Sequence, residues 1–218
     1  MLEFAPRNNW RRGALSSVRQ GRLQRAPFHV PLSRSLQPRE PVHTRSVRFD
    51  AYRRADALWD LEAHLTDTRT FDTHLESGVR PAGAPVHDMW LRLTVDEELN
   101  VLDAEASTDS MPYPGFCQTI APEYRKLIGL DLLRGFRLRT TELFGRIQGC
   151  THLTEMLAHF PTAAVQAMFR KTRDDGVKPF QLDRCHALRT DAEAVRRYYP
   201  RWFRDGSPDS DRTDKPEP

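Results

Sequence analysis

The strongest constraint on the fold is an alternation of apolar and polar residues that runs through the first half of the chain and stops near Pro112. Val47, Phe49 and Ala51 alternate with polar neighbours, and the residues over 59–65 repeat the pattern. Because successive side chains of a strand point to opposite faces, both segments are predicted to be strands. A turn at 54–56 joins them into a hairpin, with one apolar face for the core.

A second hairpin is expected from the same pattern further along the chain. Residues 89–95 alternate, residues 96–98 reverse the chain, and residues 102–106 return with small apolar side chains. Two consecutive hairpins predict an antiparallel sheet in the front half of the protein.

The period changes after Pro112, and the back half is expected to be helical. Pro122 suits the first position of a helix, and Gly129 can end it. Apolar residues recur at helical spacing after His152, with Pro161 expected to kink or split that helix. We expect helices over 122–128, 138–144, 152–170 and 190–199. The predicted class is α+β, with an antiparallel sheet from two N-terminal hairpins packed against C-terminal helices.

Two helix starts carry capping signals. Thr151 is a plausible N-cap for the helix that follows Cys150. Thr190 with Glu193 resembles a capping box for the last helix, which should end before Pro200.

Composition separates a central domain from two tails. Hydrophobic residues make up 39% of the 218-residue chain, which suffices for one core but is low for a chain folded throughout. Residues 1–42 are rich in Arg and Pro, and the end of the chain is rich in Asp, Ser and Pro. We therefore expect a disordered basic arm over 1–42, one α+β domain over 43–203 and a disordered acidic tail over 204–218.

The sequence indicates neither a membrane span nor a secretory signal. No apolar run reaches the roughly 20 residues that a membrane span needs, and the N-terminus has no apolar core of a secretory signal. Three widely spaced cysteines do not fit a disulfide framework and do fit free thiols or metal ligands. We expect a soluble, cytoplasmic protein; the sequence leaves its protein partner and its oligomeric state open.

The cysteines are the leading candidates for chemistry. Cys150 lies just before a predicted helix and two residues from His152, and this setting favours a thiolate. Cys117 follows a proline-rich turn, and Cys185 precedes a histidine. His87 and Asp88 open the third predicted strand. Three thiolates with one histidine could form a tetrahedral zinc site or hold an iron–sulfur cluster, and three unconnected buried thiols are the alternative.

Other residues give weaker signals. His64, Asp67 and His74 could be ligands or acid–base groups, but polar residues at a strand end are usually only exposed. The sequence contains no nucleotide-binding glycine motif, no serine-hydrolase motif and no HExxH zinc motif.

Three segments carry a resemblance to a known family. WDLEAHLTDT (59–68), VHDMWLRLTVD (86–96) and GCTHLT (149–154) look like an uncharacterised bacterial family, the domain of unknown function numbered 2889. The similarity runs from about His43 to Trp202. Cys117, the segment 185–188 and the segment 199–202 also look typical of that family. The resemblance implies no reaction.

A second, more distant resemblance concerns residues 85–170. The order of sheet, ligand loop, helices and a cysteine before a long helix is similar to the NifU-like (IscU/SufU) iron–sulfur scaffolds. In that family three cysteines and an aspartate hold the metal. Here Cys117 and Cys150 match the second and third cysteines, and His87 or Asp88 falls near the aspartate. Pro85-Val86 occupies the place of the first cysteine, so Cys185 or His152 would have to complete the site.

The sequence leaves three functions open. The first is an accessory protein with a NifU/SufE-like fold that binds zinc or an iron–sulfur species through Cys117, Cys150, Cys185 and His87 or Asp88. The second is a thiol enzyme or persulfide carrier that uses Cys150 with His152 or His87 as base. The third is an adaptor that binds nucleic acid or another partner through the arginine-rich arm, although we do not expect nucleic acid among its partners. Enzymatic activity is not expected under the first hypothesis.

Overall fold

A computed structural model describes residues 32–168 and 176–205 of the chain. Contacts divide the chain into two units, residues 1–40 and residues 41–218. Of the predicted tails, 1–42 and 204–218, the parts over 1–31 and 206–218 lie outside the described residues, and residues 32–40 contain no helix or strand. Among the helices of the described residues, none has the length and apolar character needed to cross a membrane.

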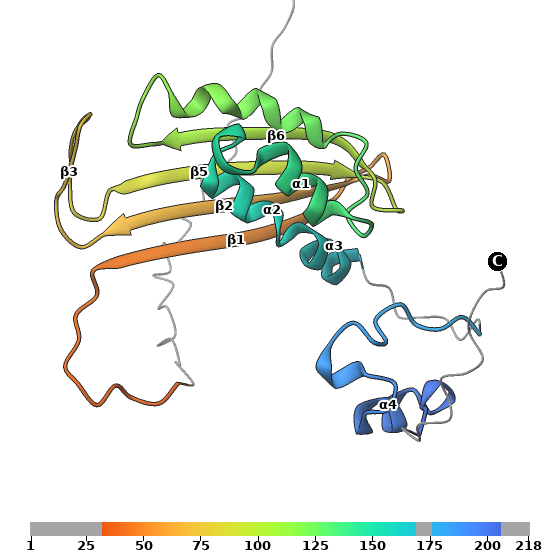
Figure 1. The fold of residues 1–218 in the computed structure, drawn as a ribbon. Helices are drawn as coiled ribbons and strands as arrows, with labels where there is room; N and C mark the ends of the chain where they lie inside the picture. Colours follow the sequence, from red (N-terminus) through yellow and green to blue (C-terminus); the bar gives the residue numbers. More distant parts are fainter. Residues whose placement is uncertain (1–31, 169–175, 206–218) are drawn as a thin grey trace, which may run out of the picture. The chain divides into compact units, whose positions relative to one another are not determined.

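A four-stranded antiparallel sheet is the centre of the second unit (Figure 1). Its strands occur in the spatial order β1-β2-β5-β6. Both predicted hairpins are confirmed, and every strand is longer than its alternating segment. The strands are β1 (His43–Arg53), β2 (Trp59–Arg69), β5 (Pro85–Val95) and β6 (Val101–Ser110).

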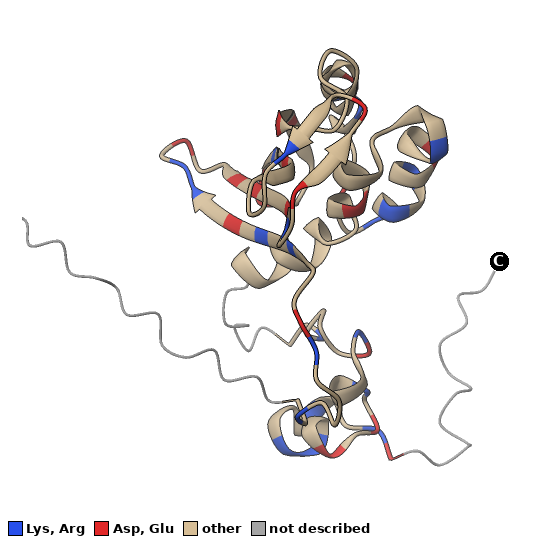
Figure 2. Cartoon of the chain, turned by 90° about the vertical axis from the view of Figure 1, so that its left-hand side faces the viewer, with Lys and Arg blue, Asp and Glu red and all other residues tan. Residues whose placement is uncertain are grey.

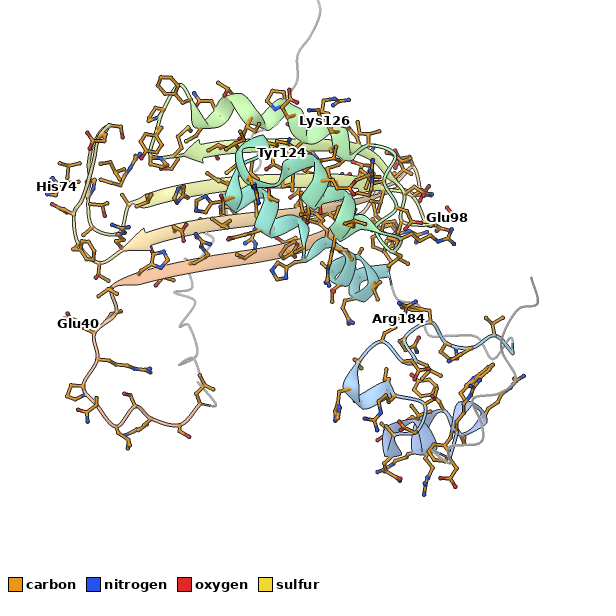
Figure 3. All side chains as sticks on the ribbon, viewed as in Figure 1. Glu40, His74, Glu98, Tyr124, Lys126 and Arg184 are labelled. Atoms are coloured by element: carbon orange, nitrogen blue, oxygen red, sulfur yellow. The ribbon has the colours of Figure 1, made fainter. Side chains whose placement is uncertain are left out.

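A small hairpin between β2 and β5 was not predicted. It consists of β3 (Thr73–Leu75) and β4 (Gly78–Arg80). Each strand has three residues, too few for an alternating pattern to be recognised. His74 on β3 and Glu98 in the turn between β5 and β6 lie at opposite ends of the sheet (Figure 3).

Helical elements follow the sheet, as expected, but two differ in detail. The segment around Pro122 belongs to the 3-10 helix η1 (Cys117–Leu127) rather than to a helix that starts at Pro122. The predicted 152–170 helix is split just before Pro161, whose missing N–H is tolerated in a first turn. The helices of this region are α1 (Phe136–Phe144), η2 (Arg146–Gln148), α2 (Thr151–Leu157) and α3 (Phe160–Met168).

Residues 176–205 contain η3 (His186–Leu188), α4 (Glu193–Tyr198) and η4 (Pro200–Trp202). The predicted capping box is wrong, because the N-cap of α4 is Ala192. Thr190 instead donates from its backbone N–H to Asp183 Oδ1 at 2.8 Å. The predicted N-cap at Thr151 is also wrong, since Cys150 is the N-cap of α2 and makes no side-chain capping bond.

The core lies between the sheet and the helices. α2 contacts β2 and β5, α3 contacts β1 and β2, and α1 packs on α2 (Figure 1). We call the covered side of the sheet the inner face and the opposite side the outer face. The inner face carries the buried apolar residues of the two central strands, Leu61, Ala63, Leu65, Met89, Leu91 and Leu93.

Both signs of charge occur along the strands (Figure 2). On the outer side of the first hairpin, Arg48 pairs with Asp50 at 2.8 Å. Arg54 pairs with Asp60 at 3.3 Å. Opposite charges are thus paired along β1 and across the turn that follows it.

Candidate metal centre

The apolar inner face ends in a row of polar residues that crosses three strands. Arg45 on β1 lies directly opposite Asp67 on β2, and Asp67 lies directly opposite His87 on β5. Asp67 is two residues from the core residue Leu65, and His87 is two residues from the core residue Met89. Residues two apart on a strand point to the same face. The row therefore lies on the inner face, at the end of the sheet where β1 begins and β2 ends.

Asp67 is the centre of this row and is only 4% exposed. Arg45 binds it with two hydrogen bonds of 2.9 Å, from Nε to Oδ1 and from Nη2 to Oδ2. His43 Nε2 lies 2.9 Å from Oδ1. Burial alone would raise the pKa of Asp67, but the hydrogen bonds from Arg45 and His43 outweigh it and lower the pKa to about 2. Asp67 is therefore a carboxylate at neutral pH.

Two imidazoles converge on the other oxygen of Asp67. His87 Nδ1 lies 3.1 Å from Asp67 Oδ2, and His152 Nε2 lies 3.7 Å from the same atom. The two rings are 3.8 Å apart between centroids. Burial lowers the pKa of both histidines; the charge of His152 lowers that of His87 further, and the charge of Arg45 lowers that of His152. Both imidazoles are therefore favoured in the neutral form that binds metals.

The spacing of these three groups suits a metal ion. Within residues 32–168 and 176–205, the one group of three or more ligating side chains with atoms all within 4.8 Å of one another is Asp67, His87 and His152. Zinc bonds to nitrogen and oxygen are about 2.0–2.2 Å long, so a tetrahedral ion holds its ligand atoms about 3.4 Å apart. The distances of 3.1 and 3.7 Å from Asp67 Oδ2 bracket that value.

The centre is open on one side. Asp67 and His87 line a pocket of about 540 Å³ together with Arg45 and His43. Two histidines and one carboxylate leave coordination positions free on a metal ion, and an open pocket lets a water or a substrate reach them.

His152 owes its position to the start of α2, which is fixed by a buried tyrosine. The Tyr124 hydroxyl accepts the backbone N–H of Cys150 at 3.1 Å and contacts Thr154 Oγ1 at 2.9 Å. Tyr124 extends from η1 toward α1 and α2, where its ring stacks on Phe144 at 4.4 Å (Figure 3). Its burial raises the pKa of the phenol to about 12, so the hydroxyl stays neutral.

Cys150 lies beside this centre. Its Sγ is 4.0 Å from His152 Nδ1 and 3.9 Å from Met89 Sδ. The opposite nitrogen of His152 faces Asp67, so thiol, imidazole and carboxylate form a continuous chain.

The remaining predicted ligands lie elsewhere. Cys117 is half-buried at the first residue of η1, and Cys185 is exposed just before η3. Asp88 lies on the outer face, where its Oδ1 is 2.7 Å from His64 Nε2. Of the predicted set, the group described above contains His87 and not Cys117, Cys150, Cys185 or Asp88.

Asp67 is the residue that sequence reasoning undervalued. The sequence favours an exposed residue at the end of a strand over a ligand or acid–base group, but Asp67 is buried within β2. The signal was present in the alternation, because Asp67 continues the inward series of Leu61, Ala63 and Leu65. The predicted strand ended at residue 65, and extending it would have placed Asp67 inside.

The comparison with protein families gives one match. The model of a family described as "Protein of unknown function (DUF2889)" matches residues 43–166. The chain belongs to the DUF2889 family. The part of the chain that matches DUF2889 includes the whole four-stranded sheet and all three residues of the candidate metal centre. Comparisons with curated proteins and with solved structures find no match.

Proposed function

We propose that this DUF2889 protein binds a divalent metal ion through Asp67, His87 and His152. The observation that carries the proposal is the convergence of His87 Nδ1 and His152 Nε2 on one oxygen of a buried carboxylate. Two neutral imidazoles with one ionised carboxylate form a ligand set that proteins use for zinc and for non-haem iron(II). This donor set favours a single ion over an iron–sulfur cluster, because clusters are held mainly by cysteine thiolates.

Arg45 has two roles in the proposed centre. Its bidentate bond orients Asp67 and keeps it ionised, as the hydrogen-bonded partner of a metal ligand does. Its positive charge also opposes a cation nearby. Asp67 Oδ2 lies near both Arg45 Nη2 and His87 Nδ1, and because a carboxylate oxygen has two lone pairs, it can bind an ion on the histidine side and keep the hydrogen bond from Arg45.

The test is metal binding to the full chain with a matched pair of histidine variants. Purified protein without a histidine tag is treated with a chelator and titrated with Zn²⁺, Fe²⁺ and Mn²⁺ by calorimetry. Wild type should bind one ion per chain, and H152A should bind it more than about a hundredfold more weakly, because a ligand is lost. The control is H64A, since His64 also pairs with an aspartate on the same sheet, but on the outer face. Equal affinity in H152A and wild type would refute the proposal.

A metal at this centre should also stabilise the fold. An ion at a hundred times its Kd adds about 2.7 kcal/mol to the free energy of unfolding. The increase in unfolding temperature should be present in H64A and absent in H152A.

The geometry also supports thiol chemistry at Cys150. In the chain Cys150–His152–Asp67, Nδ1 of the histidine faces the sulfur at 4.0 Å and Nε2 faces the carboxylate at 3.7 Å. A histidine so placed can accept the thiol proton, with the carboxylate stabilising the imidazolium. This function predicts a metal-free protein in which iodoacetamide alkylates Cys150 faster than Cys117 and Cys185. H152A should slow that reaction; equal rates at the three thiols would eliminate this function.

The wider role that we propose is that of an accessory protein in the cytoplasm. It is supported by the NifU-like order of sheet, helices and cysteine over residues 85–170. The visible spectrum of anaerobically purified protein separates the alternatives, since a bound cluster gives charge-transfer bands and zinc is colourless.

A further inference from the structure

A second arginine lies beside the proposed metal centre and is not part of it. Arg69 follows Asp67 by two residues on β2, so it lies on the same face, directly opposite His43. Its guanidinium carbon is 5.8 Å from the centre of the Phe71 ring. No carboxylate of the described residues lies within ion-pairing distance of it, whereas Arg45 is paired with Asp67. The N–H donors of Arg69 are therefore available to a ligand.

The pocket that Arg69 lines also has apolar walls. Val42, Phe71 and Val86 belong to its lining. Val42 is 53% exposed and Phe71 is 49% exposed, so both offer apolar area that a ligand could cover. The pocket volume of about 540 Å³ lies in the range of small-molecule sites, which is about 300–1,000 Å³.

The charge of the pocket favours an anion. Arg45 is paired with Asp67 and, outside the pocket lining, with Glu155, so Arg69 is the arginine of the pocket with no carboxylate partner among the described residues. A guanidinium presents its N–H groups in a planar fork that matches a carboxylate or a phosphate. The apolar walls distinguish these anions, because a hydrocarbon body gains from contact with Phe71 and Val86 while inorganic phosphate does not.

We propose that this pocket binds a small organic carboxylate, with its carboxylate group on Arg69 and its apolar body against Phe71, Val42 and Val86. The bound molecule would lie next to Asp67 and His87, within reach of the open side of the metal centre. That juxtaposition makes it the candidate substrate class of the centre and rests on the proposed function. Binding of the anion itself needs Arg69 and not the metal.

The experiment measures carboxylate binding to the chelator-treated full chain. Saturation-transfer NMR compares benzoate, its neutral isostere benzamide and acetate, and inorganic phosphate, which has no carbon-bound hydrogens, is titrated as a competitor of benzoate. Benzoate should bind more tightly than each of the other three. R69Q should weaken benzoate binding by about tenfold or more, because the paired, charged hydrogen bonds are lost. The matched control is R48Q, since Arg48 is also exposed but lies on the outer face and pairs with Asp50 at 2.8 Å.

The outcomes separate the two proposals. Benzoate binding that is equal in R69Q and R48Q, or no stronger than that of benzamide, would overturn the carboxylate site. Phosphate binding that depends on Arg69 and exceeds benzoate binding would overturn the organic ligand and assign the pocket to inorganic oxyanions. Because all samples are metal-free, a failure of metal binding in the H152A experiment does not alter this result. An unchanged unfolding temperature in R69Q verifies that the variant is folded.

Discussion

At the scale of single residues, environment separates two aspartate–histidine pairs that are chemically alike. Asp67 with His87 and Asp88 with His64 both connect β2 to β5. Asp67 has a side chain that is 5% exposed and bonded to Arg45, whereas the side chain of Asp88 is 26% exposed. The ring of His64 stacks on Trp90 at 3.7 Å. The ring of His87 lies against a second imidazole, that of His152. The inner pair alone is therefore equipped as a ligand set.

Acid stability should report the buried carboxylate directly. The pKa of Asp67 falls from its usual 3.8 to about 2 in the folded protein. The folded state is therefore stabilised above about pH 4, and that stabilisation is lost as the pH falls through 2. A shift of this size corresponds to about 2 kcal/mol. In denaturant titrations of metal-free protein, wild type should lose about that much more stability than D67N between pH 5 and pH 2.

D67N should also be less stable at pH 7, because it leaves Arg45 without its bidentate partner. Parallel pH profiles for the two proteins would show that the charge of Asp67 does not stabilise the fold.

At the scale of elements, α2 depends on contacts that replace a capping side chain. Its N-cap, Cys150, makes no capping bond, and the Tyr124 hydroxyl accepts the Cys150 N–H instead. Gly149 lets the backbone before Cys150 pass close to Phe144 of α1, since a Cβ at position 149 would lie 2.5 Å from the Phe144 backbone oxygen. Tyr124 and Gly149 thus position the turn from which His152 reaches Asp67.

The elements also mark what the sequence could predict. Alternation predicted both hairpins, and helical spacing with Pro161 predicted the division between α2 and α3. The capping predictions at Thr151 and Thr190 were wrong because local capping signals compete with tertiary partners, here Tyr124 and Asp183. The alternation of side chains along β2 and β5 would have placed Asp67 and His87 on one face of the sheet and Asp88 on the other. The approach of His152 could not be predicted, because it depends on how α2 lies against the sheet.

At the scale of the whole molecule, every residue of the proposed centre lies in the unit 41–218, and so does the apolar core. β1 lies within this unit and begins at His43, whose Nε2 is 2.9 Å from Asp67 Oδ1. The first contacts of the sheet unit are made at its very start: Thr70 Oγ1 donates to the Pro41 carbonyl oxygen at 2.9 Å. A boundary after Glu40 therefore keeps all the described contacts of the centre.

Deletion of residues 1–40 should consequently leave the metal site intact. The shortened chain should bind one ion per chain with the affinity of the full chain, and its unfolding temperature should agree within about 2 °C, because the core of the described residues contains none of the deleted positions. Calorimetric titration and thermal unfolding of both chains measure this. The adaptor hypothesis predicts a different loss, since salt-sensitive nucleic-acid binding by the full chain should disappear with the arginines of the deleted segment. Weaker metal binding by the shortened chain would show instead that residues 1–40 contribute to the centre.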